Sequence, residues 1–589
     1  MAFPLHRDIL NPGPKDPSLL TQQNNHISSH IWSGKDHMLL PKQSYVRGPK
    51  PPEPILAMLK VAGFGYVVEI ENFDIDVSLI SALVERWRPE TCTFHLPYGE
   101  CTITLEDVAL QLGIPVDGHA LTGIIAEDWS IVCQELLGAV PPKNAWGGEG
   151  VALSWFANRF ENLPINAPHN VVQQYTRAYI MRLIGSLLLP DKRGTHVHLM
   201  YLPLLKNLSS VGHYSWGSGV LACLYREMCH ASKINSNQIG GCLVLLQAWA
   251  WDRIPSIAPK IDQSSGDQVH RGLGFPLSCR WSHCKKTTEN SKHWVQCYRF
   301  SLDKLDVHEF IWTPYTSPDV RRYIPQDPGE VCYAIVPLIC CAIVEWHHPD
   351  RVMRQFGLRQ SIPQPPMNID RLRKMDLKVR GKAYWPEATW INLWLQRRER
   401  LIQGFPSHAY FGDVSNYMKW YLDVTRKWIS HEGALAGTMV IGVRNILRFA
   451  TSETPNPIKC ENIIQVCNDM LNVSHNYHSA PTYDSRQGNN ENLQYKKPIN
   501  DPYKQPYPMG FASYSKTHNP FSFSESHPTG PFYSVGAPPP PLMYNANPGT
   551  TTFSRGAHLH MPKPYGPPIP SFETEDEDES EDDFESEDY

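Results

Sequence analysis

The sequence predicts a mainly α-helical fold: one large helical domain with a small β-hairpin near its N-terminal part, followed by a disordered C-terminal tail. Three observations lead to this class. Apolar residues recur at helical spacing in many segments between about residues 51 and 455. Alternating, strand-like runs are few there. After Cys467 aliphatic residues become rare and Pro, Ser, Tyr, Asn and Gly dominate, a composition that cannot bury enough surface to fold.

These changes in composition divide the 589-residue chain into four parts. Residues 1–50, which are polar and interrupted by proline, are predicted to form a flexible arm, and residues 51–455 the helical domain. Residues 456–572 are predicted to be a disordered linker, and residues 573–589 an acidic tail. The tail dominates the net charge of -5, so the rest of the chain is only mildly basic. That balance is too weak to indicate a nucleic-acid-binding face, and direct nucleic-acid binding is left open.

The first strong local pattern lies near the start of the helical domain. DVSLISALVERW, residues 76–87, carries apolar side chains at helical spacing on one face. Pro97-Tyr98-Gly99 is a turn signal between two short β-compatible runs, which predicts the hairpin. Thr104 then precedes Asp107 by three positions, an imperfect capping box opening a helix that Gly113 ends. Turns and caps therefore account for the polar residues without any catalysis.

Three later runs are more apolar. GVLACLYREMC, residues 219–229, repeats the helical spacing. IGGCLVLLQAWAWDRIP, residues 239–255, is apolar almost all round, as expected of a central buried helix that ends at Pro255. VCYAIVPLICCAIV, residues 331–344, is too short to cross a bilayer as a helix. We predict a buried helix there, and no membrane association.

Motifs for catalysis are incomplete throughout the chain. GDQVH at Gly266, GDVSNY at Gly412 and GNNE at Gly488 each lack a ligand that a metallophosphatase centre needs. HYSWGSG lacks the glycine two residues before Ser215 that a nucleophile elbow requires. There is no phosphate-binding loop and no Schiff-base lysine with its partners. We therefore predict a non-enzymatic protein with no cofactor.

Cysteine and histidine clusters are interpreted as structural. Fourteen cysteines without the apolar core of a signal peptide predict reduced thiols in the cytosol or nucleus. The spacing within CRWSHCKKTTENSKHWVQC is too irregular for a zinc knuckle, which favours loop cysteines. The histidine pairs lack an identifiable third ligand. The stretch CRWSHCKKTTENSKHWVQC contributes Cys279, Cys284, His293 and Cys297. The two histidine pairs are His196 with His198, and His347 with His348.

Six blocks occur in an order and spacing that resemble the plant mobile domain, in the form found in MAIN-like proteins. They are FHLPYGECTITLEDVALQLGIPVDG, YIMRLIGSLLLPDKRGTHVHLMYLPLL, YSWGSGVLACLYREMCHAS, IGGCLVLLQAWAWDRIP, FIWTPY and WHHPDRVMRQFGLRQSIP. The resemblance covers about residues 55–455. The same domain stands in the long form of plant serine/threonine-protein phosphatase 7.

The resemblance implies a plant nuclear protein that acts in transposable-element silencing, gene expression, genome integrity and the maintenance of dividing meristem cells. It also implies protein partners, among them a phosphatase-like protein carrying the same domain. Two alternatives stay open: a transposon-encoded accessory protein, and an enzyme or regulatory subunit allied to protein phosphatases. An aminotransferase-like description of this domain has no support from the residues.

Two further charged segments are candidates for nuclear import and for phosphorylation. The run RLRKMDLKVRGK is a candidate nuclear-import signal or phosphate-contacting edge, against the alternative of a solvated face. Its basic residues are Arg371, Arg373, Lys374, Lys378, Arg380 and Lys382. In the acidic tail, Thr574, Ser580 and Ser586 precede acidic residues and are candidate phosphosites for an acid-directed kinase. A solubilising tail is the alternative.

Overall fold

The computed structural model describes residues 11–41, 48–123, 126, 128–190, 194–259, 274–282, 284, 291–305, 307–374, 388–406, 415–450, 461 and 463–467. All of them belong to one compact unit, Met1–Gln487. The second unit, Gly488–Tyr589, contains most of the predicted linker and the whole acidic tail, and it lies outside the described residues.

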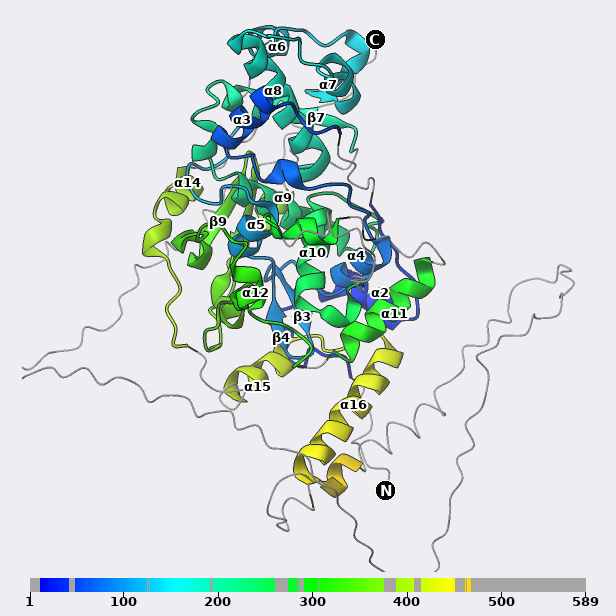
Figure 1. Cartoon of the computed structure of the whole chain (residues 1–589). Coiled ribbons are helices and arrows are strands. Elements are labelled where there is room, and N and C mark those ends of the chain that lie inside the picture. The colour runs from blue at the N-terminus through cyan, green and yellow to red at the C-terminus, as the bar shows by residue number, and fades with distance from the viewer. Residues whose placement is uncertain are drawn as a thin grey trace, which may run out of the picture. The chain divides into compact units, whose positions relative to one another are not determined.

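The predicted mainly α-helical class is confirmed (Figure 1). Short 3-10 segments join the α-helices, which are α2 (Ile27–Trp32), α3 (Glu53–Val61), α4 (Val77–Val84), α5 (Leu105–Leu112), α6 (Trp129–Leu137), α7 (Leu153–Arg159), α8 (His169–Leu183), α9 (Trp216–Ala231), α10 (Leu243–Arg253), α11 (Ser291–Asp303), α12 (Pro318–Arg321), α13 (Asp370–Lys374), α14 (Ala388–Leu395), α15 (Ser415–Val424) and α16 (His431–Ala450). Helices α3, α6 and α7 pack on α8 at one end of the unit.

The predicted hairpin is present, and a third strand joins it. Strands β2 (Trp87–Arg88), β3 (Thr93–Leu96) and β4 (Gly99–Cys101) form an antiparallel sheet in that order. The capping box of α5 is complete, because the Thr104 hydroxyl accepts from the Asp107 amide and the Asp107 carboxylate accepts from the Thr104 amide. Gly113 ends the helix with φ 64°, in the left-handed region that favours glycine.

The predicted buried helix at residues 331–344 is wrong. The segment forms strand β9 (Val336–Cys340), which pairs antiparallel with β10 (Ile343–His347). Cys341 turns between them at φ 54°. Helices α9 and α14 pack on β9, so both faces are covered and the apolar run shows no alternation. Length and periodicity alone do not separate such a strand pair from a buried helix, and the β-branched residues were the better signal.

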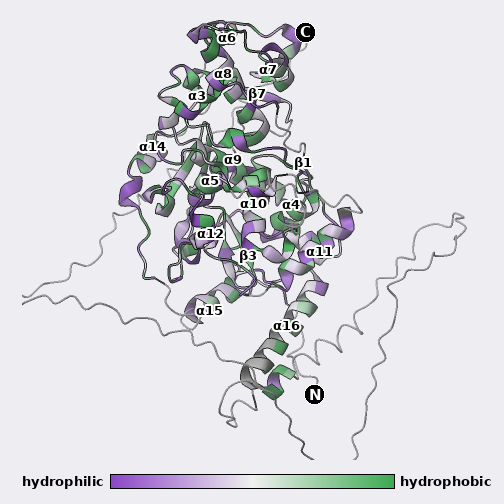
Figure 2. Cartoon of the chain, in the orientation of Figure 1, coloured by the Kyte–Doolittle hydropathy of each residue, from purple (hydrophilic) through white to green (hydrophobic). Residues whose placement is uncertain are grey.

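The core centres on α9 and α10. Every residue of α10 from Leu243 to Arg253 is buried, which confirms the prediction of a central helix. Its Trp249 stacks on Phe94 of β3 with ring centroids 5.1 Å apart. Figure 2 shows hydrophobic residues concentrated on these elements and on α4 and α5. Two smaller sheets complete the unit: β5 (Trp146–Gly147), β6 (Gly150–Ala152) and β7 (His196–His198), and β1 (Leu40–Pro41) beside β8 (Gln238–Ile239).

The N-terminal segment is folded against the domain over residues 11–41, which corrects the expectation of a flexible arm. Ile27 and Ile31 of α2 form a buried cluster with Ile429, just before α16. His26 bonds through Nε2 to the carbonyl of Trp87 at 2.8 Å, and the amide of Lys15 donates to the carbonyl of Asp423. Burying the apolar face of α2 stabilises the segment, although its composition is polar overall.

Polar residues around the β2–β4 sheet are buried in ion pairs. Turns and caps explain little of this polarity, because each side chain reaches a partner far along the chain. The pairs are Glu85 with Arg299 (2.7 Å), Glu100 with Arg351 (2.6 Å), Asp107 with Arg253 (2.7 Å) and Arg86 with Asp303. Breaking a buried pair leaves one charge buried without a counter-charge, which is strongly destabilising. These contacts therefore fix the position of the sheet relative to α10, α11 and the residues after β10.

Candidate functional site

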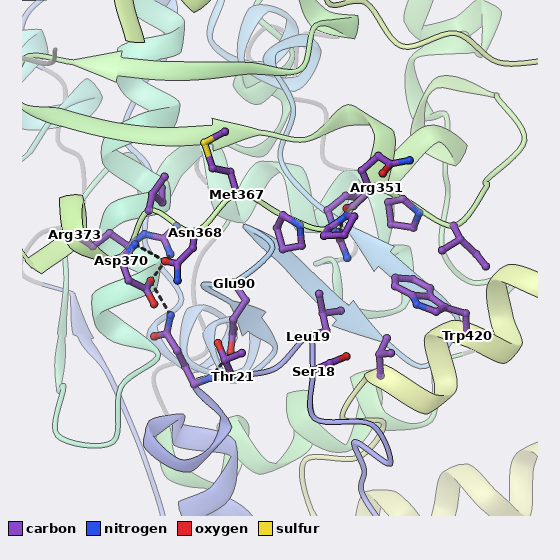
Figure 3. A pocket seen from close by; sticks show the side chains of 18 residues that line it. Ser18, Leu19, Thr21, Glu90, Arg351, Met367, Asn368, Asp370, Arg373 and Trp420 are labelled. Carbon is purple, nitrogen blue, oxygen red and sulfur yellow. Dashed lines mark hydrogen bonds and ion pairs between the residues drawn. The ribbon is translucent and has the colours of Figure 1, made fainter. Parts of the chain in front are cut away.

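A pocket of about 540 Å³ opens between the N-terminal segment and the stretch from Ile362 to Asp370. Ser18, Leu19, Thr21 and Gln22 line one side, and the proline-rich stretch IPQPPMNID lines the other. Trp420 of α15 closes one end beside Leu19 and Arg351, and Asp370 and Arg373 of α13 stand at the other (Figure 3). Three segments distant in sequence therefore build a single concave surface.

The walls of the pocket combine stiff apolar residues with polar and charged side chains. Pro363, Pro365 and Pro366 line the pocket, and proline has few backbone states to lose when a ligand binds. Trp420 adds an aromatic surface, while Met367, 40% exposed, offers an adaptable thioether side chain. Binding pockets usually combine apolar walls with polar groups that fix the orientation of the ligand, and both are present here.

Glu90 points into this space from the connection between β2 and β3 (Figure 3). Its Oε1 accepts from the amide of Gln22 at 2.7 Å, whereas Oε2 is buried with no hydrogen-bond partner among the described residues. Burial raises the pKa of Glu90, and the nearby Arg88 guanidinium partly offsets that rise. Burial in turn lowers the pKa of Arg88 to about 9. A donor or cation entering the pocket would satisfy the unpartnered carboxylate oxygen.

An arginine–carboxylate network lies directly beneath the pocket. Glu345 of β10 is fully buried and binds Arg226 of α9 at 2.5 Å and Arg373 of α13 at 2.5 Å. Burial opposes the charge of Glu345, but Arg373 and Arg226 together hold its pKa below the usual value. Arg373 also donates to the carbonyl of Pro89 at 2.8 Å and to the sulfur of Cys92 at 3.1 Å. This one side chain links the pocket wall to the interior.

Cys92, Cys229 and Glu345 form one group of side chains whose ligand-type atoms lie within 4.8 Å of one another, the one such group of three in the described part of the chain. Two thiols and a carboxylate are a plausible partial set of zinc ligands. However, Arg226 and Arg373 already bind both oxygens of Glu345, and an added cation would face two guanidinium charges. The residues present therefore do not fit a resident metal ion.

The structure places part of the predicted basic cluster. Arg371 is exposed on α13, whereas Arg373 is bound in the network beneath the pocket. The side chain of Lys374 lies outside the described residues, as do Lys378, Arg380 and Lys382. The candidate phosphosites Thr574, Ser580 and Ser586 also lie outside them. Arg373 thus has a structural role that the sequence pattern does not reveal, and the import signal stays a prediction.

The histidine pairs occupy hydrogen-bonded positions in the fold. His347 is buried, with Nδ1 2.9 Å from the carbonyl of Ala334 and Nε2 3.3 Å from the amide of Leu105. His348 pairs with Asp350 at 3.4 Å, and His198 with Glu149 at 3.2 Å. His196 lies 2.9 Å from the hydroxyl of Thr195.

Among the predicted lookalike zinc ligands, Cys297 and His293 are one helical turn apart on α11, with their sulfur and Nε2 atoms 3.5 Å apart. Cys279 and Cys284 flank the end of a 3-10 segment, Leu277–Trp281, and pack partly buried against the core.

Glu90, Cys92, Cys229 and Glu345 were not singled out from the sequence. One signal was available: Arg226 and Cys229 lie three residues apart on a helix that is apolar on most of its surface, and Arg226 is 4% exposed. A charge on a core-facing helix implies a buried partner. The identity of that partner, 119 residues further along, depends on the tertiary fold alone.

The helical fold carries its buried ion pairs and its pocket within one unit, and comparison with known families identifies the class of domain. The family model for the plant mobile domain matches residues 63–422, more than half of the chain. The chain therefore belongs to the plant mobile domain family, which confirms the resemblance seen in the six sequence blocks. No helix among the described residues is long and apolar enough to span a bilayer.

Several relatives from Arabidopsis thaliana share this region. The serine/threonine-protein phosphatase 7 long form homolog is 39% identical over 72% of this chain, and the match spans 32% of that relative. Protein MAIN-LIKE 1 is 35% identical over 71% of this chain and 80% of its own length. Protein MAINTENANCE OF MERISTEMS is 34% identical over 73% of this chain and 87% of its own length. No solved structure matches the chain.

Proposed function

We propose that this protein is a non-enzymatic nuclear interaction module of the MAIN-like kind, acting in transposable-element silencing, gene expression control and genome integrity in dividing meristem cells. Family membership supports the proposal, as does the name of the relative MAINTENANCE OF MERISTEMS, which the match covers over 87% of its length. The nearly whole-length match makes a shared role more plausible than a match to one part would.

The pocket between the N-terminal segment and α15 is the proposed contact with a protein partner. One observation carries this step: the pocket lined by prolines and Trp420 is also lined by Glu90, and one buried carboxylate oxygen of Glu90 has no hydrogen-bond partner among the described residues. An aliphatic stem that ends in a cation, as in lysine or arginine, matches both features. A partner segment carrying such a side chain is the proposed occupant.

The partner itself is proposed to be a phosphatase-like protein that carries the same domain. The similarity to the phosphatase 7 long form homolog supports this choice, because it shows the domain joined to a longer chain. That relative's name also favours a second candidate function, a regulatory subunit allied to protein phosphatases. The match spans only 32% of that relative, so its activity is not carried over to this chain.

Affinity purification of the full chain from dividing plant tissue, followed by mass spectrometry, tests the proposal. We expect a nuclear fraction and a co-purifying phosphatase-like chain. Trp420→Ala and Glu90→Gln should reduce recovery of that chain roughly tenfold, a loss of about 1.4 kcal/mol. Leu422→Ala on the same helix is the matched control, because Leu422 is exposed and does not line the pocket.

Two outcomes would contradict the proposal. Equal recovery of the phosphatase-like chain with all variants would show that the pocket does not contact this partner. Turnover of a phosphate ester by the purified chain, abolished by one substitution, would replace the non-enzymatic function with catalysis. Terminal repeats and a neighbouring transposase in the genome would instead favour the transposon-encoded accessory protein.

A further inference from the structure

Two cysteines from different segments meet beneath the pocket. Cys92 is the last residue of the turn between β2 and β3, and Cys229 lies in the last turn of α9. Their sulfur atoms lie within 4.8 Å of each other, and the side chains are 4% and 2% exposed. Cys92 adopts φ 52°, a conformation uncommon for residues other than glycine. The surrounding fold therefore holds this thiol in place at some conformational cost.

The groups around the two sulfur atoms shift the pKa values of the two thiols in opposite directions. The indole N–H of Trp87 donates to the sulfur of Cys229 at 3.3 Å, and Arg373 lies 3.1 Å from the sulfur of Cys92. Burial opposes both thiolates, but the hydrogen bond from Cys92 and the charge of Arg373 lower the pKa of Cys229 against the opposing charge of Glu345. Burial and the bond to Cys229 raise the pKa of Cys92. Cys229 is therefore the better nucleophile of the two.

A second pocket of about 300 Å³ borders Cys229 and offers a small oxidant a route to this residue. Cys229 lines it, together with Pro89, Lys233 and Arg373. A peroxide molecule is about as large as two waters, so it needs only a small part of this volume. Two other buried thiols, Cys133 and Cys242, have a less reactive environment, because burial raises the pKa of each to about 12.

We propose that Cys92 and Cys229 form a peroxide-sensitive dithiol, in which hydrogen peroxide oxidises Cys229 and Cys92 then closes a Cys92–Cys229 disulfide. In the first step the thiolate attacks one peroxide oxygen, an S–O bond forms, the O–O bond breaks, and hydroxide leaves and becomes water. In the second, the sulfur of Cys92 attacks the sulfenic acid, the S–S bond forms and a second water leaves. The pair loses two electrons and peroxide gains them.

Glu345 is placed to help the second step. Its Oε2 lies 3.7 Å from the sulfur of Cys92 and can receive the thiol proton as the S–S bond forms. The disulfide then links the β2–β3 connection covalently to the end of α9. It also changes the sulfur of Cys92, which accepts a hydrogen bond from Arg373 in the reduced state. Since Arg373 also lines the partner pocket, oxidation would change a wall of that pocket. The dithiol chemistry itself does not depend on the proposed function.

The test treats the full, reduced chain with graded hydrogen peroxide, blocks remaining thiols and maps peptides by mass spectrometry. Trypsin releases Glu227–Lys233, in which Cys229 is the one cysteine. We expect this peptide joined to the one that carries Cys92, with fragmentation placing the bridge at Cys92 rather than at Cys101 or Cys133. The bridge should form at least about tenfold faster than modification of Cys133 or Cys242.

Two variants give the test its direction. Cys92→Ser should leave Cys229 as a sulfenic acid that dimedone labels, because the resolving thiol is gone. Cys229→Ser should leave Cys92 reduced, and Cys242→Ser should behave as the unaltered chain. The thermal melt of each reduced variant shows whether it has folded. If a variant does not fold, mapping the Cys92–Cys229 disulfide in the unaltered chain still tests the proposal.

Three results would overturn the proposal: no Cys92–Cys229 bridge in the unaltered chain, the opposite labelling order in the variants, or preferential oxidation at Cys340. Cys340 is the strongest competitor, since hydrogen bonds from Cys223, Cys341 and Tyr201 lower its pKa despite burial.

Discussion

At the residue scale, the charges near the β2–β4 sheet show how much a single buried side chain depends on its partner. Glu85 is fully buried, and both its oxygens accept from Arg299 at 2.7 and 2.8 Å. Lys50 and Glu69 form a pair of similar length, 3.1 Å, but on the surface. Solvent weakens the surface pair much more than the buried pair, so two ion pairs of similar length differ in their contribution to stability.

Arg299→Met should therefore lower the free energy of unfolding by about 3–5 kcal/mol, because it strands the charge of Glu85. Lys50→Met, the surface control, should cost less than about 1 kcal/mol. Urea unfolding of the full chain measures both. The double variant Glu85→Gln with Arg299→Met should recover much of the loss, and equal costs for the two single variants would refute the buried-pair argument.

His347 should make stability depend on pH. Burial lowers its pKa to about 4 in the folded chain, against an ordinary value of 6.5. As the pH falls below 6.5 the unfolded chain takes up the proton first, so the free energy of unfolding falls by about 1.4 kcal/mol per pH unit until pH 4. Above pH 6.5 the contribution is complete.

His347→Gln should remove that part of the slope in urea unfolding measured from about pH 4.5 to 7. The exposed His119→Gln is the control and should leave the slope as it is. An unaltered slope in His347→Gln would assign the acid sensitivity to other buried groups, such as His26 and His95, whose pKa values burial also lowers.

At the element scale, local signals predicted helix ends better than they predicted buried strands. The hairpin turn, the capping box and the helix end at Gly113 were each predicted from a short local pattern, and all three are present. The β9–β10 pair was missed because its neighbours α9 and α14 cover both faces and remove the alternation. The candidate site was missed for a related reason: Glu90, Cys92, Cys229 and Glu345 come together only through tertiary packing.

The capping box of α5 gives a prediction at this scale. Thr104→Ala should cost about 0.5–2 kcal/mol of unfolding free energy, since the amide of Asp107 loses its acceptor within a buried turn. Thr104→Ser retains the hydroxyl and should cost clearly less. Chemical denaturation compares the two, and an equally large loss from serine would point to the methyl group rather than to the cap.

At the scale of the whole molecule, the two ends of the described chain belong to one structure. The N-terminal segment contacts α15, the start of α16 and the β2–β3 connection. Composition placed a boundary near residue 50, because it measures average polarity and does not register a few well-placed apolar residues such as Ile27 and Ile31.

Deleting residues 1–41 should accordingly lower the melting temperature by several degrees, since Leu20, Ile27, Ile31 and Leu39 are each buried and contribute roughly 1.5–3 kcal/mol apiece. Deleting residues 488–589, which form the separate second unit, should change it by less than about 1 °C. Differential scanning calorimetry measures both truncations, and a large shift only in the second would reverse the assignment.

The contact between Ile27 and Ile429 also has a consequence for biosynthesis. The carbonyl of Pro12 accepts from the amide of Lys427, so the segment around Pro12 and Ile27 is synthesised some 400 residues before its partners. Such distant pairing slows folding and leaves apolar surface uncovered in the meantime. The partner pocket, whose wall includes Leu19 and Trp420, is therefore assembled only when almost all of the domain has been synthesised.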